Sequence, residues 1–127
     1  EGQGSLFHPS FAGVSTGLIH GAQPDALVLC HDPMRRTMRG LPHYQPPSLD
    51  DCLEANLRAA RLTNPDVRAV GIALNTSAMD EDAAADLCAR TADNMGLPCC
   101  DPYRMGVDAV VDLLLAMDAP AAATETI

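Results

Sequence analysis

Short apolar runs and stretches of helical periodicity alternate along the chain. Residues 25–32 and 67–75 are continuous apolar runs of strand length that end in polar residues, which is typical of strands buried in a parallel sheet. Between them, residues 48–63 place apolar side chains on one helical stripe, with Ser48 as the N-cap and Asp51 at the third helical position. This alternation predicts an α/β fold with a mostly parallel sheet.

The alternation continues on both sides of this unit. Ser77 is placed to cap a further helix and Gly96 to end it. In the last predicted helix, the expected apolar stripe consists of Val107, Val110, Val111 and Leu114. The further predicted elements are a helix over 77–96, a short strand over 97–102, a helix over 106–118 and a weaker helix over about 11–20.

The length of the chain limits it to one domain. A chain of 127 residues can bury one modest core, and we expect a single domain over residues 1–118. Residues 119–127 carry no periodic pattern and are predicted to form a disordered tail. No apolar run reaches the roughly 18 residues that a membrane span requires, so we expect no membrane partner.

Composition narrows the classes of partner further. The net charge is -9 and the chain contains no lysine, which argues against binding to a nucleic acid. Two Phe, two Tyr and no Trp leave few aromatic surfaces on which bases could stack. The five cysteines are an odd number without a Cys-x-x-Cys pair, which disfavours a disulfide framework or a structural zinc site. We therefore expect a protein of the reducing cytoplasm.

The chain opens with "EGQGSLFHPS", in which two closely spaced glycines follow a carboxylate. In parallel α/β sheets, ligands gather at the carboxyl ends of the strands. Glu1 would lie at this edge if a strand preceded it, but the sequence contains no such strand. We therefore expect a domain that is truncated before Glu1, with the missing amino-terminal portion of the same protein as a partner.

Two histidines are candidate catalytic bases, because histidine titrates in the range useful for proton transfer. His31 follows a predicted strand directly, and His8 lies in the opening loop at the same predicted edge. The alternative, which the sequence favours somewhat for each histidine taken singly, is a structural role in which the ring hydrogen-bonds a loop.

Three of the eight arginines lie close together in the loop that follows the first strand. Arg35, Arg36 and Arg39, with Gly40, are candidates to bind an acidic small-molecule substrate, because guanidinium groups pair with carboxylates and phosphates. The alternative is a solvated loop that offsets nearby acidic residues.

The motifs together resemble a known family. "EGQGSLFHP" is similar to the acidic, glycine-rich loop of dethiobiotin synthetase and its P-loop relatives, and "VGIALN" resembles the strand end that approaches the nucleobase there. More closely, "PDALVLCHDP", "LPHYQPPSLDDCLEANLRAARLTNPDVRAVGIALNTS" and "GLPCCDPYRMGVD" resemble the carboxyl-terminal part of the bacterial D-glutamate N-acetyltransferase family, formerly of unknown function. The resemblance covers nearly the whole chain except its tail.

This resemblance implies a partial P-loop-type three-layer sandwich. It also implies that the longer protein moves an acetyl group from acetyl-CoA to the amine of D-glutamate or a similar acidic amino acid. The residues expected to contact the acetyl-CoA co-substrate are Glu1, Gly2, Gly4, Ser5 and Asn75. We expect no resident metal and a homo-oligomeric assembly.

Two other functions stay open at this point. One is an ATP- and magnesium-dependent ligase or kinase of the dethiobiotin synthetase type, in which Glu1 would be a magnesium ligand. The other is a non-catalytic chain that folds together with the missing portion.

Overall fold

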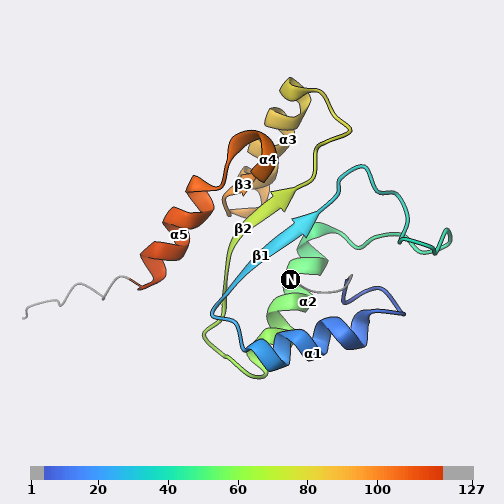
Figure 1. The fold of residues 1–127 in the computed structure, drawn as a ribbon, viewed down its shortest axis with the longest axis vertical. Helices are drawn as coiled ribbons and strands as arrows, with labels where there is room; N and C mark the ends of the chain where they lie inside the picture. Colours follow the sequence, from blue (N-terminus) through green and yellow to red (C-terminus); the bar gives the residue numbers. More distant parts are fainter. Residues whose placement is uncertain (1–4, 119–127) are drawn as a thin grey trace, which may run out of the picture.

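The computed structural model describes residues 5–118 and consists of a small parallel sheet flanked by helices (Figure 1). The strands β1 (Ala26–His31), β2 (Arg68–Leu74) and β3 (Cys99–Cys100) lie in the order β1-β2-β3, and both pairs are parallel. The helices are α1 (Ala12–Ala22), α2 (Leu49–Arg61), α3 (Glu81–Met95), α4 (Pro102–Met105) and α5 (Asp108–Asp118). The prediction of an α/β fold with a parallel sheet is confirmed.

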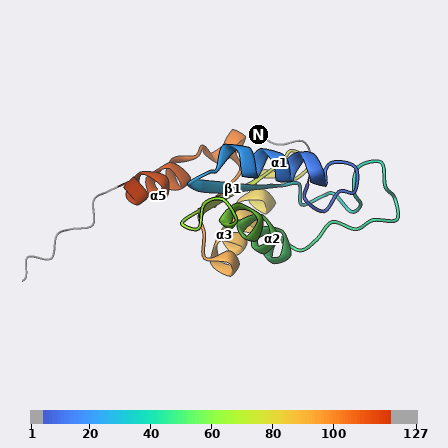
Figure 2. The same cartoon turned by 90° about the horizontal axis from the view of Figure 1, so that it is seen from below.

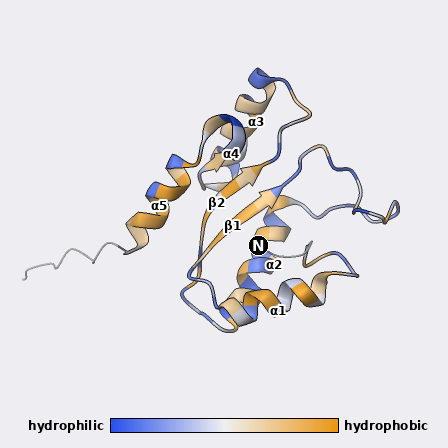
Figure 3. Cartoon of the chain, viewed as in Figure 1, coloured by the Kyte–Doolittle hydropathy of each residue, from blue (hydrophilic) through white to orange (hydrophobic). Residues whose placement is uncertain are grey.

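Helices cover both sides of the sheet. Figure 2 shows α2 and α3 on one side and α1 and α5 on the other. On the first side, Leu29 of β1 and Ile72 of β2 pack with Cys88 of α3 in one buried cluster. On the second side, Val70 of β2 packs against Val110 of α5. β2 therefore buries side chains on both faces, and its sequence is almost entirely apolar (Figure 3). In β1, Leu29 is buried whereas Val28 and Cys30 are exposed.

The caps of the two crossover helices differ in how well the sequence predicts them. Ser48 caps α2 as predicted, because its hydroxyl accepts a hydrogen bond from the amide of Asp51 at 3.1 Å. The prediction that Ser77 caps α3 is wrong: Asp80 is the N-cap and accepts from the amide of Ala83 at 2.8 Å. Gly96 ends α3 in the left-handed conformation, as predicted.

The last two helices also depart from the predictions. The sequence analysis missed α4, a single turn between β3 and α5. Within α5, Val110 is the buried member of the predicted stripe, whereas Val107, Val111 and Leu114 are exposed. The face that packs on the sheet consists of Val110, Leu113 and Met117. The predicted apolar face of this helix is therefore wrong except at Val110.

The predicted tail over 119–127 lies outside the described residues. Within residues 5–118, no helix combines the length and the apolar character needed to cross a membrane.

A glycine lets α5 approach β2 closely. A Cβ atom added at Gly71 would lie 2.6 Å from Cγ2 of Val110 and 3.3 Å from the backbone oxygen of Pro98. A side chain at this position would therefore push α5 away from the sheet or force the Val110 side chain to move.

We predict that Gly71→Ala lowers the free energy of unfolding of the protein by about 1–3 kcal/mol through this overlap. Combining it with Val110→Ala should recover part of the loss, because the second change removes the atoms that the new methyl group meets. Urea denaturation of the two single variants and the double variant measures this coupling. Strictly additive losses would show that the Val110 side chain is not the obstacle.

Candidate functional site

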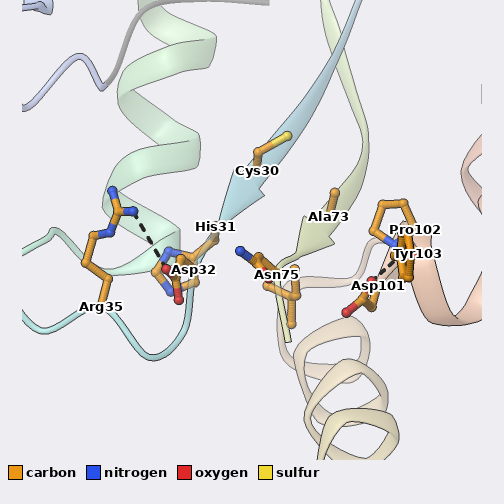
Figure 4. Close-up of a pocket in the computed structure, with 10 residues that line it drawn as sticks. Cys30, His31, Asp32, Arg35, Ala73, Asn75, Asp101, Pro102 and Tyr103 are labelled. Carbon is orange, nitrogen blue, oxygen red and sulfur yellow. Dashed lines mark hydrogen bonds and ion pairs between the residues drawn. The ribbon is translucent and has the colours of Figure 1, made fainter. Parts of the chain in front are cut away.

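The carboxyl ends of the three strands meet at one edge of the sheet, where the structure forms an open cleft of about 420 Å³ (Figure 4). β1 ends at His31, Asn75 follows β2 and Asp101 follows β3. The cleft is lined by Cys30, His31, Asp32, Arg35, Ala73, Leu74, Asn75, Asp101, Pro102 and Tyr103. Polar groups delivered by successive strands thus surround one opening, as ligand sites of parallel α/β sheets require.

His31 is the titratable ring at the end of β1. Its backbone carbonyl accepts a hydrogen bond from the amide of Asn75 at 2.9 Å, which ties the ends of β1 and β2 together. Burial lowers the pKa of His31 below the ordinary value of 6.5; the Asp32 carboxylate opposes this shift and the Arg35 guanidinium adds to it. The imidazole is therefore neutral at pH 7 and able to accept a proton.

Asp32 and Arg35 form a loose ion pair beside this ring. Nη2 of Arg35 lies 3.7 Å from Oδ2 of Asp32, and the two side chains are 51% and 34% exposed. Oδ1 of Asp32 also accepts from the amide of Met34 at 3.1 Å, which holds the carboxylate in the turn after β1. An exposed pair at this distance contributes little to stability, so Arg35 can exchange its partner for the carboxylate of a ligand.

On the other side of the cleft, the buried Asp101 side chain connects the segments that follow β2 and β3. Its carboxylate accepts hydrogen bonds from the amide of Thr76 at 3.1 Å, from the Thr76 hydroxyl and from the amide of Tyr103 at 2.9 Å. The Thr76 hydroxyl contributes most to lowering the pKa of Asp101, and burial opposes this shift. The ionised carboxylate therefore clamps the segment after β2 to the segment after β3.

Arg104 extends this clamp. Its Nε lies 3.7 Å from Oδ2 of Asp101, and its Nη2 donates to the carbonyls of Thr76 at 3.3 Å and Met79 at 2.8 Å. The segment between β2 and α3 is held by these contacts in a non-helical conformation, which explains why α3 begins at Glu81 and not at the predicted cap Ser77.

Asn75 and Tyr103 present polar and aromatic groups at the mouth of the cleft. Asn75 is exposed, and its Oδ1 accepts from the amide of Ser77 at 3.2 Å. Figure 4 shows Asn75 between His31 and Asp101. Tyr103 is 99% exposed at the start of α4. An amide and an accessible ring are groups that recognise a planar heteroaromatic ligand.

Two of the predicted site residues lie elsewhere. His8 is buried; its Nδ1 accepts from the amide of Ser10 at 3.1 Å, so its Nε2 donates to the carbonyl of Arg39 at 3.0 Å. This arrangement occupies both ring nitrogens and favours the structural interpretation of His8. Ser5 accepts from the amide of Phe7 and lines a groove beside β1, not the cleft.

The predicted substrate contacts in the loop between β1 and α2 also lie in different places. Arg35 lines the cleft, whereas Arg36, Arg39 and Gly40 are exposed and do not belong to its lining. Figure 1 shows the loop between β1 and α2 reaching out beyond the strand ends. The predicted residues Glu1, Gly2 and Gly4 lie outside the described part of the chain.

Three of the cysteines, Cys88, Cys99 and Cys100, are poor nucleophiles and do not line the cleft. Burial raises the pKa of Cys88 and Cys100, and burial together with the neighbouring Cys88 raises the pKa of Cys99 to about 12. These thiols stay protonated at neutral pH. Among residues 5–118, no three side chains of the histidine, cysteine, aspartate or glutamate type come together as a metal site.

The sequence alone does not single out Thr76, Asp101 and Arg104, whose contacts hold together the segments beside the cleft. A usable signal was present: "CDPYR" places an aspartate before a proline directly after a predicted strand, which is the pattern of an N-cap followed by the first residue of a helix. The pairing of Asp101 with Thr76 spans 25 positions and depends on β2 and β3 being neighbours.

Comparison with known proteins shows the family of this chain. A family model described as the P-loop domain of a domain of unknown function, DUF1611_C, matches residues 1–111. The chain belongs to the DUF1611 family. The resemblance to the carboxyl-terminal part of that family's proteins, expected from the motifs, is thereby confirmed.

Two curated DUF1611 relatives carry a functional name. A D-glutamate N-acetyltransferase from Pseudoalteromonas sp. is 55% identical over 111 residues, which are 87% of this chain and 33% of the relative. A D-glutamate N-acetyltransferase from Tritonibacter scottomollicae is 49% identical over 117 residues, which are 92% of this chain and 35% of the relative. The chain spans about a third of the length of these relatives.

A solved structure agrees with the fold. The crystal structure of a DUF1611 family protein from Anabaena variabilis superimposes with a TM-score of 0.83 at 38% sequence identity, covering 91% of this chain and 34% of that protein. The partial P-loop-type α/β architecture expected from the resemblance is therefore shown.

We predict that Asp101→Asn lowers the free energy of unfolding by about 2 kcal/mol at pH 7, because the neutral amide supports fewer of the hydrogen bonds that converge on this buried site. The pKa of Asp101 is lowered by folding, so its contribution is complete above the unfolded value of 3.8 and is lost as the pH falls through the lower folded value.

The difference in stability between the parent protein and Asp101→Asn should therefore shrink below about pH 4. Urea denaturation at pH 7 and in the acid range measures it. Asp86→Asn, which removes an exposed helix-surface pair with Arg90, is the matched control and should change stability by less than about 0.5 kcal/mol. A difference for Asp101→Asn that does not depend on pH would contradict the clamp.

Proposed function

We propose that the protein containing this chain transfers an acetyl group from acetyl-CoA to the amino group of D-glutamate, and that this chain forms one wall of the substrate cleft. The observation that carries the proposal is the juxtaposition of a neutral histidine, a loosely held arginine and an exposed asparagine at the strand ends. Relatives at 49–55% identity are named D-glutamate N-acetyltransferases, which supports the same reaction here.

The reaction needs a base, because the amino group of an amino acid is protonated at neutral pH. In the proposed mechanism, His31 accepts a proton from the ammonium group through its neutral ring. The amine nitrogen then attacks the thioester carbon of acetyl-CoA, a C–N bond forms and the C–S bond breaks. CoA leaves as a thiolate that takes up the second proton lost by the nitrogen, and His31 releases the first proton to solvent. His31 is half-buried at the end of β1, where a fixed backbone holds the ring.

Arg35 is assigned to a carboxylate of D-glutamate. It reaches the cleft from the turn after β1 and is held by Asp32 through one contact of 3.7 Å. A bidentate pair with a substrate carboxylate is stronger than this exposed contact, so binding of the substrate can displace Asp32. Arg36 and Arg39 do not line the cleft, although Arg39 with Gly40 is the substrate contact that the sequence favours most.

The residues of the cleft also fit the nucleotide end of acetyl-CoA. Asn75 offers an amide and Tyr103 an accessible ring, and about 420 Å³ accommodates part of a CoA molecule but not the whole of it. The rest of the co-substrate would have to contact other parts of the longer protein.

We predict that His31→Asn in the full-length protein lowers kcat/KM for D-glutamate by at least about 100-fold, because the acceptor loses its base. In the parent enzyme, the rate should rise with pH through an apparent pKa below 6.5, since the neutral form of a histidine with a lowered pKa is the active one. His43→Asn, an exposed loop histidine outside the cleft, is the control and should leave the profile unchanged.

The assay is run with acetyl-CoA alone and with added ATP and magnesium. Acetylation that needs neither addition supports the proposal. A strict requirement for ATP and magnesium would favour the ligase or kinase, and an unchanged pH profile in His31→Asn would remove His31 from the mechanism.

Arg35→Ala should raise the KM for D-glutamate by about tenfold or more, with a smaller change for an acceptor that lacks the side-chain carboxylate. Arg58→Ala, which removes a surface pair with Glu54 on α2, is the control and should have no effect. If steady-state kinetics show a larger rise in KM for Arg39→Ala than for Arg35→Ala, Arg39 and not Arg35 contacts the substrate carboxylate.

A further inference from the structure

The turn after β1 holds three titratable or charged groups of the cleft within five residues. His31 ends the strand, and the amide of Arg35 donates to the carbonyl of Asp32 at 3.1 Å, which closes the turn. Oδ1 of Asp32 accepts from the amide of Met34 at 3.1 Å, whereas Oδ2 lies 3.7 Å from the Arg35 guanidinium (Figure 4). One oxygen of this carboxylate is therefore fixed to the backbone, and the other has a partner that can be exchanged.

The ring of His31 differs from those of His8 and His20, which are held by the fold. Nε2 of His8 and Nε2 of His20 lie 3.0 and 2.9 Å from backbone carbonyl oxygens. Within residues 5–118, neither ring nitrogen of His31 has a hydrogen-bond partner. A protonated imidazole has two N–H donors and a positive charge, so a carboxylate nearby stabilises it.

Asp32 is the carboxylate whose charge acts on this ring. Burial lowers the pKa of His31, the Asp32 carboxylate raises it, and the Arg35 guanidinium lowers it again. Asp32 and Arg35 thus act on His31 in opposite directions while they are paired with each other. A ligand that neutralises Arg35 would leave the effect of Asp32 unopposed.

Other titratable groups of the described residues lie around the ring without adding a charge that shifts its pKa. Those in the remaining cleft lining are Cys30, Asp101 and Tyr103. The side chains that α2 packs against the core beside β1 are Leu49, Cys52 and Leu53. Asp101 is held by Thr76 and Arg104, and burial raises the pKa of Cys52, so this thiol is neutral at pH 7. The ion pair after β1 is therefore the charge pair that acts on the ring.

We propose that Asp32 is a positioning residue that changes partner during the reaction: a substrate carboxylate pairs with Arg35, and the released Oδ2 of Asp32 stabilises the imidazolium formed at His31. The inference rests on the proposed function, in which His31 is the base and Arg35 binds the acceptor. The proton leaves the substrate ammonium, whose bonding pair stays on nitrogen, and forms an N–H bond with the ring. Each of the two cations then has its own carboxylate, and His31 is a stronger base in the complex than in the free enzyme.

NMR titration of the His31 ring in the full-length protein tests the change of partner. The probe is glutarate, a dicarboxylate that can pair with Arg35 but has no amine to acetylate. Saturating glutarate should raise the midpoint of the His31 titration by about 0.5 pH units or more. In Asp32→Asn, which keeps an oxygen for the amide of Met34, the rise should be smaller by about half or more. Equal rises in the two proteins, or no binding of glutarate to the parent protein, would overturn the proposal.

Steady-state kinetics separate positioning from a structural role. Asp32→Asn should lower kcat by about tenfold or more, while the KM for D-glutamate stays the same or falls, because Arg35 loses a competing carboxylate. Asp32→Glu should recover part of kcat. Glu54→Gln, which frees Arg58 from an exposed pair on α2, is the matched control and should change neither constant. A higher KM with an unchanged kcat for Asp32→Asn would contradict the assignment.

The two measurements fail separately from the proposed function. If His31→Asn leaves the rate unchanged, His31 is not the base, and the NMR titration still decides whether Asp32 changes partner. If His31→Asn removes activity but the rise with glutarate is the same in the parent protein and in Asp32→Asn, His31 is the base and Asp32 acts only as a fixed charge.

Discussion

The parallel pairing of β1 with β2 is the constraint on which the cleft depends. The register places His31 opposite Leu74, so the first residues after the two strands emerge side by side. Most side chains of β2 are buried in the two faces of the sheet, and polar groups can therefore appear where the strands end. The hydrogen bond from Asn75 to the carbonyl of His31 is the last rung of this ladder and the first contact of the cleft.

The sequence predicted most of this frame for a simple physical reason. Strands buried on both faces and a helix with one apolar side have periodicities that are visible along the chain, and both parallel strands and α2 were found within two residues of their ends. His31, Arg35 and Asn75 are predicted from their position after strand ends or in the loop between them, and all three line the cleft. Position relative to a strand is local information, which a single sequence contains.

The sequence could not predict contacts between distant segments. The capping oxygen of α3 comes from Asp80 and not from Ser77, because Asp101 and Arg104 hold the intervening residues in another conformation. Likewise, three neighbouring arginines look alike in the sequence, but the turn held by Asp32 brings Arg35 to the cleft while Arg39 lies farther out. The contact of His8 could not be predicted for the same reason, since its partner is a carbonyl 31 positions away.

The charge of the chain makes the distinction between its arginines important. A chain of net charge -9 repels an anionic ligand at long range, although this repulsion is screened beyond about 8 Å at physiological ionic strength. Affinity for an anion must therefore come from a cation close to the bound molecule. Arg104 is committed to Asp101 and to two backbone carbonyls, and these contacts maintain the shape of the cleft. Arg35 has a loose carboxylate partner and lines the opening. Of these two arginines near the strand ends, one fixes the geometry and the other can exchange its partner for a ligand.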